Sequence, residues 1–129
     1  MKVWHGTSIV NLIKLLKADS SELYVTDTPD RAARYANAQA TEHVSTAYER
    51  PAPGTAILEI ESELLSWSVR GKDHNTLDTC EAVTRNYRIV SATIRWFEYE
   101  NTAYDNHMHR DQVKEYLALR GIEVIEVTH

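Results

Sequence analysis

The chain has 129 residues, 43% of them hydrophobic and 26% charged, and a formal charge of −5 at pH 7. This length and balance predict one globular domain, residues 1–129, whose core needs no metal or disulfide. The single cysteine, Cys80, excludes an intramolecular disulfide and a cysteine-built metal site. The acidic balance disfavours nonspecific binding to a phosphate backbone, although Arg85, Arg88 and Arg95 leave a local basic face open.

The sequence carries no visible secretory leader and no apolar stretch as long as a membrane span. We therefore expect a cytoplasmic protein without a membrane partner, and an effector exported by a signal-free route is the alternative. His107 and His109 stand two residues apart on an expected loop. That spacing is not diagnostic of a metal site, so we expect surface histidines and no bound metal.

Apolar periodicity and capping signals predict the secondary structure. In chain order we expect a strand at 2–5, a helix at 8–17, a strand at 23–25, a helix from 28 to about 43, strands at 55–61 and 81–84, a long strand or hairpin at 89–100, a helix at 105–119 and a strand at 122–127. Ser8 and Thr28 are the expected N-caps, Pro29 occupies a first helical position, and Gly121 ends the last helix.

The stretch at 62–77 is the hardest to interpret, with a helical turn at 63–65 and a polar loop at 70–75 as its expected features. Short strands, two early helices and then further strands favour an α+β domain on a mixed or antiparallel sheet.

Three segments in the first third of the chain carry the chemistry. They are Val-Trp-His-Gly-Thr at 3–7, Leu-Tyr-Val-Thr-Asp at 23–27 and Ala-Arg-Tyr-Ala at 33–36. Their tyrosines, Tyr24 and Tyr35, are eleven residues apart. In these motifs, their order and this spacing, the chain resembles the His-Tyr-Glu branch of the ADP-ribosyltransferase fold, which includes diphtheria-toxin-like and poly(ADP-ribose)-polymerase-like enzymes. The resemblance rests on motifs over about the first 45 residues and on strand order thereafter.

The resemblance implies an ADP-ribosyltransferase-like split sheet with a cleft for NAD, which serves as co-substrate. In that cleft, His5 would donate a ring N–H to a ribose hydroxyl, and Gly6 would bond the nicotinamide amide through its backbone. Thr7 would offer its hydroxyl to a ribose. Tyr24 and Tyr35 would hold the nicotinamide ring between them, because aromatic side chains supply a rigid apolar slot.

The resemblance also requires a carboxylate beside the nicotinamide ribose, where positive charge develops as the glycosidic bond breaks. Glu81, which opens a predicted strand, fits that position best and would join His5 and Tyr24 as the catalytic residues. Glu98 and Glu100 remain alternatives, since together they resemble the paired glutamates of arginine-modifying relatives. Those relatives carry an arginine on the first strand, where this chain has a histidine.

One contact of the family is missing from the motif. Polymerase-like relatives place a serine three residues before the second tyrosine, where it bonds the nicotinamide amide. Ala32 stands at that position. The contact is therefore absent from this protein or supplied by another residue.

Together these features predict an enzyme, an NAD-dependent ADP-ribosyltransferase. It would be a glycosyltransferase that cuts the nicotinamide–ribose bond and transfers ADP-ribose to a macromolecular acceptor. The acidic charge favours a protein acceptor over a nucleic acid, and for a small free-standing form the resemblance implies a toxin or a phage-encoded modifier. The alternatives are a catalytically inactive module that binds NAD or ADP-ribose and acts through partners, and an enzyme similar to RNA 2′-phosphotransferases, which would need basic residues along its cleft.

Overall fold

The computed structural model describes residues 1–18, 22–42, 54–63, 68–70, 79–96 and 107–127. Their elements follow one another along the chain as β1 (Lys2–Ser8), α1 (Ile9–Ala18), β2 (Leu23–Thr26), α2 (Pro29–Glu42), β3 (Gly54–Ser62), β4 (Ser68–Arg70), β5 (Thr79–Thr84), β6 (Tyr87–Trp96), α3 (His107–Leu119) and β7 (Glu123–Val127).

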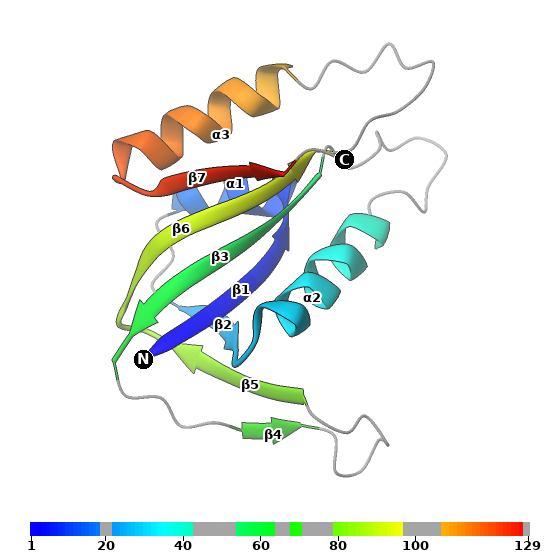
Figure 1. Ribbon diagram of the computed structural model, residues 1–129, viewed down its shortest axis with the longest axis vertical. Coiled ribbons are helices and arrows are strands. Elements are labelled where there is room, and N and C mark those ends of the chain that lie inside the picture. The colour runs from blue at the N-terminus through cyan, green and yellow to red at the C-terminus, as the bar shows by residue number, and fades with distance from the viewer. Residues whose placement is uncertain (19–21, 43–53, 64–67, 71–78, 97–106, 128–129) are drawn as a thin grey trace.

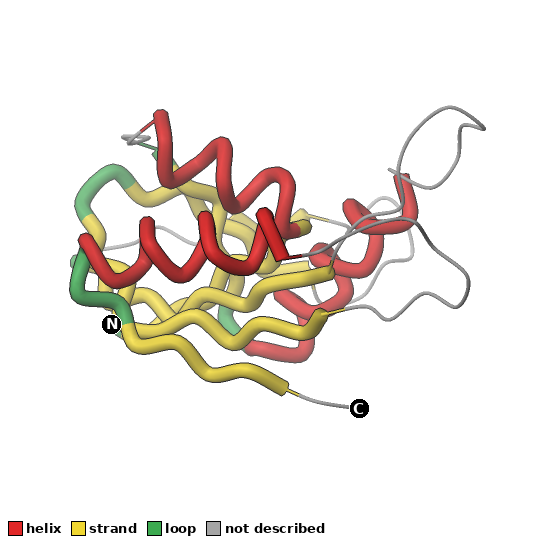
Figure 2. The backbone as a smooth tube through the Cα atoms, turned by 90° about the horizontal axis from the view of Figure 1, so that it is seen from above, coloured by secondary structure: helices red, strands yellow, loops and turns green. Residues whose placement is uncertain are grey.

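The strands form a seven-stranded sheet in the order β4-β5-β2-β1-β3-β6-β7 (Figure 1). All neighbouring strands are antiparallel except β6 and β7, which run parallel. The predicted α+β class with a mixed sheet is therefore confirmed. The helices lie on both faces of this sheet: α1 and α3 lie side by side over one face, and α2 packs on the other (Figure 2).

The core lies between the sheet and the helices α1 and α3. Val3, Leu58 and Ile94 point to this face from β1, β3 and β6, and each is fully buried. Leu12 of α1 and Leu117 of α3 meet them with no exposed surface. Burying one such side chain is worth about 1.5–3 kcal/mol, so this layer supplies much of the stability of the sheet.

Local signals set the helix ends as expected. The Ser8 hydroxyl accepts a hydrogen bond from the Asn11 N–H at 3.2 Å, and the Thr28 hydroxyl accepts one from the Arg31 N–H at 3.3 Å. Gly121, the second residue after α3, has a φ of 67°, the left-handed conformation that glycine adopts at the end of a helix.

Three expectations about the elements were wrong. β1 continues through Ser8, because residues 6–8 pair with β3 although their composition is typical of a turn. β4 reaches Arg70, which the sequence placed in a polar loop. The backbones of His107 and His109 lie in the first turn of α3, so they belong to the helix expected at 105–119 and the loop expected at these two residues is wrong. Residues 64–67 and 71–78, which hold most of the expected helical turn and polar loop, lie outside the described residues.

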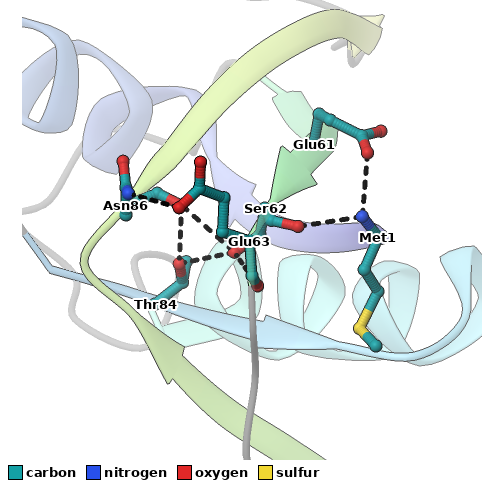
Figure 3. A network of polar contacts seen from close by, with 6 residues as sticks. All are labelled: Met1, Glu61, Ser62, Glu63, Thr84 and Asn86. Atoms are coloured by element: carbon teal, nitrogen blue, oxygen red, sulfur yellow. Dashed lines mark hydrogen bonds and ion pairs between the residues drawn. The ribbon is translucent and has the colours of Figure 1, made fainter.

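A polar network joins β1, β3 and the β5–β6 turn at one end of the sheet (Figure 3). The buried hydroxyls of Ser62 and Thr84 are 2.7 Å apart, and Ser62 also donates to the Asn86 carbonyl. The Met1 amino group donates to the Ser62 carbonyl at 2.9 Å and to the Glu61 carboxylate at 2.8 Å. These described groups bond to one another within the fold.

The backbone of α2 lies directly against β1 at Gly6. A Cβ atom on Gly6 would lie 1.6 Å from the Ala32 carbonyl oxygen and 2.4 Å from the Ala32 carbonyl carbon. No rotamer change relieves a clash between a Cβ and a backbone. Only glycine therefore allows α2 to approach β1 this closely.

Gly6→Ala should lower the free energy of unfolding by about 3 kcal/mol, because the methyl group has no room beside the α2 backbone. Urea denaturation measures the change. Gly121→Ala is the matched control: its methyl group meets open space, and only the positive φ costs about 1 kcal/mol. Equal losses in the two variants would contradict the close packing at Gly6.

Candidate functional site

β1 and β2 separate beyond a single paired position. β1 pairs with β3 along Lys2–Ser8, whereas its pairing with β2 is confined to Trp4 and Thr26. Met1 and Ser62 exchange backbone hydrogen bonds across β1 and β3. Because the bonding side alternates along an antiparallel strand, the N–H and C=O of Gly6 point toward β2, where the ladder has ended. At the split these two backbone groups therefore lie on the side of β1 where no pairing with β2 is found among the described residues.

A cavity of about 280 Å³ occupies this split. Its size lies near the lower limit for small-molecule sites, about 300–1,000 Å³. It is lined by Trp4, His5, Gly6, Tyr24, Val25, Thr26, Tyr35 and Gln39. Four of the five residues that the sequence assigned to NAD binding are therefore brought together by β1, β2 and α2.

His5 connects the two diverging strands through its side chain. Its Nδ1 lies 2.5 Å from the carbonyl oxygen of Tyr24. A carbonyl oxygen only accepts hydrogen bonds, so Nδ1 carries the proton. Burial lowers the pKa of His5 below its ordinary value of 6.5, and the bond to the Tyr24 carbonyl opposes that shift only in part. His5 is therefore neutral at pH 7, with Nε2 as an acceptor.

This arrangement changes the role expected for His5. The sequence assigned its ring N–H to a ribose hydroxyl, but that N–H is donated to Tyr24. The remaining nitrogen accepts, so a ligand hydroxyl would donate to Nε2. A hydroxyl at this position would therefore be the donor, and not, as the sequence predicted, the acceptor.

The two tyrosines reach the cavity from different elements. Tyr24 lies on β2 with 60% of its surface exposed, and Tyr35 lies on α2 and is half-buried. Thr28 caps α2 and Pro29 begins it directly after the short turn that follows β2, so the helix carries Tyr35 back over the split. The eleven residues from Tyr24 to Tyr35 comprise the last two residues of β2, the turn at 27–28 and the first two turns of α2.

Thr7 does not line the cavity. Its side chain is 1% exposed, and its hydroxyl donates to the Gln39 Oε1 at 2.9 Å. The hydroxyl contact to a ribose that the sequence predicted for Thr7 has no support in this geometry. Thr7 instead connects β1 to α2.

The backbone of Glu81 lies in line with the one position at which β1 and β2 pair. Its Cα partner on β2 is Thr26, whose Cα partner on β1 is Trp4, and both of these residues line the cavity. The side chain of Glu81 is not among those described. Glu98 and Glu100, the alternative carboxylates, lie outside the described residues.

The sequence missed three groups of this site. Gln39 follows Tyr35 by four residues, one helical turn, so both lie on the same face of α2, but this spacing alone does not show that Gln39 reaches the cavity. Trp4, which we expected in the core or at its rim, also lines the cavity. So does Thr26, to which the sequence assigned no role. Ala32 does not line it, because this residue is fully buried against Gly6.

Within the described ranges, no group of three or more His, Cys, Asp or Glu side chains is placed to hold a metal ion. In the same part of the chain, no helix has the length and apolar character needed to cross a membrane. Comparisons with protein-family models, with curated proteins and with solved structures found no match to this chain.

The depressed pKa of His5 predicts a pH dependence of stability. Below pH 6.5 the unfolded chain binds a proton at residue 5 that the folded chain does not. The free energy of unfolding should therefore fall as the pH drops from 6.5 toward the folded pKa of His5. Urea denaturation between pH 5 and 8 measures this loss in the native chain and in His5→Asn, whose side-chain amide keeps a donor near the Tyr24 carbonyl. The loss should be smaller in His5→Asn; an equal loss would assign the dependence to other groups.

Proposed function

We propose that this protein is an NAD-dependent ADP-ribosyltransferase. One observation carries the proposal: a single cavity, in the split between β1 and β2, gathers His5, Gly6, Tyr24 and Tyr35. These are the residues to which the sequence motifs assign NAD binding. They come from three elements and span about thirty positions of the chain, so their convergence supports a common purpose.

The cavity suits the nicotinamide end of the dinucleotide. With about 280 Å³, it holds a substituted pyridine ring and leaves the adenosine half outside. Tyr24 and Tyr35 supply aromatic surface for the ring, and aromatic contacts of this kind are worth about 0.5–1.5 kcal/mol beyond area burial. The Gly6 N–H and C=O match a carboxamide, which has one acceptor and one donor group. His5 would accept a ribose hydroxyl at Nε2.

The reaction is a displacement at the anomeric carbon of the nicotinamide ribose. The bond between this carbon and the ring nitrogen breaks, and its electron pair leaves with nicotinamide. A nucleophile of the acceptor forms the new bond to the same carbon and releases its proton. Glu81, whose position shares a cross-strand row with Thr26, would stabilise the positive charge that develops on the sugar. Binding at His5 and Gly6 would hold the sugar beside it.

The rival functions make different demands on this site. A transferase acting on an RNA 2′-phosphate needs cations in the cleft, and the described residues that line the cavity include no lysine or arginine. A catalytically inactive module that binds NAD or ADP-ribose needs only the pocket. Nicotinamide release from NAD separates this module from the enzyme. The acceptor we propose is a protein, and the small enzyme would act as a toxin or a phage-encoded modifier.

Glu81→Gln should lower nicotinamide release by about 10²–10³-fold, because the neutral amide no longer stabilises the charge on the ribose. Chromatography of the reaction with NAD measures release, and calorimetry should give an unchanged affinity for NAD. Glu123→Gln on β7, an exposed position on the far edge of the sheet, is the matched control and should keep full activity. Full release by Glu81→Gln would move the catalytic role to Glu98 or Glu100, and NAD binding without release by the native chain would favour the inactive module.

Tyr24→Ala and Tyr35→Ala should each weaken NAD binding about tenfold through lost ring contact. Tyr24 is largely exposed, so its truncation should leave the thermal midpoint within a few degrees of the native value. Calorimetric titration and thermal melting give the two quantities. A loss of stability of about 3–5 kcal/mol in Tyr35→Ala, the cost of a core deletion, would show that Tyr35 serves the core instead of a ligand.

A further inference from the structure

The side-chain amide of Gln39 makes all of its described hydrogen bonds through its oxygen, Oε1. Its Oε1 lies 2.9 Å from the Thr7 hydroxyl, 3.1 Å from the Ser8 backbone nitrogen and 3.1 Å from the Asn11 Nδ2. A backbone N–H can only donate, so the atom facing Ser8 must be the amide oxygen. These three donors therefore fix the orientation of the amide.

This fixed orientation leaves the Nε2 amino group of Gln39 for the cavity, which the side chain also lines. Gln39 is half-buried and its side chain lines the cavity, while the three bonds described above all use its Oε1. The Ser8 N–H lies on the side of β1 where β2 no longer pairs. The Gln39 oxygen accepts this N–H in place of a backbone carbonyl of β2. The amide oxygen thus accepts the Ser8 N–H at the edge of β1, and the amide nitrogen supplies N–H donors for the cavity.

We infer that Gln39 is a specificity-determining residue, which donates from Nε2 to the carboxamide oxygen of the nicotinamide ring. The inference rests on the proposed function. It assigns the contact that a serine at position 32 makes in the resembling enzymes. Ala32 is buried against Gly6, whereas Gln39 lies two helical turns later on the same face of α2. Gly6 and Gln39 then donate to the carboxamide oxygen together, and the Gly6 carbonyl accepts from the carboxamide nitrogen.

Gln39→Glu separates the two functions of the side chain. The carboxylate keeps an oxygen for Thr7, Ser8 and Asn11, so the thermal midpoint should stay within a few degrees of the native value. It replaces the amino donor with a second acceptor, which repels the ligand carboxamide oxygen. The ligands are nicotinamide and 3-methylpyridine, both of which are largely uncharged at pH 8 and fill the same slot. Only nicotinamide carries the carboxamide.

We expect Gln39→Glu to weaken nicotinamide about tenfold, the effect of one lost hydrogen bond and an opposed acceptor, and to change 3-methylpyridine less than about twofold. NMR titration measures both dissociation constants. Gln112→Glu on α3, on the other face of the sheet, makes the same charge change and should alter neither. Equal weakening of both ligands, or of neither, would overturn the role of Gln39 while leaving the pocket intact. If the native chain binds neither nicotinamide nor NAD, the proposed function itself fails, and the role of Gln39 fails with it.

Discussion

The contact between Gly6 and the Ala32 carbonyl is the constraint on which the site depends. β1 is held to β3 along its whole length, and α2 follows β2 after a short turn. Only residues 27 and 28 separate β2 from α2, so α2 must pack over β1 from its first turn. It does so with the α2 backbone pressed on a residue that has no side chain. This close approach brings Tyr35 and Gln39 of α2 to the split where β2 leaves β1.

The site follows from how the split satisfies its hydrogen bonds. Backbone groups removed from a ladder need other partners, because burying them unpaired is costly. The Tyr24 carbonyl takes the His5 ring N–H, and the Ser8 N–H takes the Gln39 oxygen. Gly6 remains, with its N–H and C=O directed into the cavity. The groups left over by this arrangement are those that a carboxamide and a ribose hydroxyl can use.

The two ends of the sheet differ in how their polar groups find hydrogen-bond partners. Near Met1 and Ser62, hydroxyls, carbonyls and the amino group satisfy one another within the fold. At the split, Gly6 lies beyond the single position at which β1 pairs with β2, and Tyr24 and Tyr35 line the cavity there. A sheet end whose described polar groups bond to one another, beside a split between two strands, suits a scaffold that positions a site on its strands. The proposed chemistry depends in addition on Glu81, whose backbone register lies beside Thr26.

The sequence by itself determined the features that depend on near neighbours. Ser8 and Thr28 cap helices through bonds to residues three positions away, and alternation marks the strands, so the α+β class followed from local patterns. The resemblance of three short motifs to a known family singled out His5, Gly6, Tyr24 and Tyr35, which line one cavity. The tertiary structure alone decided that residues 6–8 continue β1, because their pairing with β3 overrides their preference for turns. It also decided the proton direction at His5, the commitment of Thr7 to α2 and the entry of Gln39 into the cavity. Each of these depends on which atom of a residue about twenty to fifty positions away lies within hydrogen-bonding distance, and no local pattern encodes that distance.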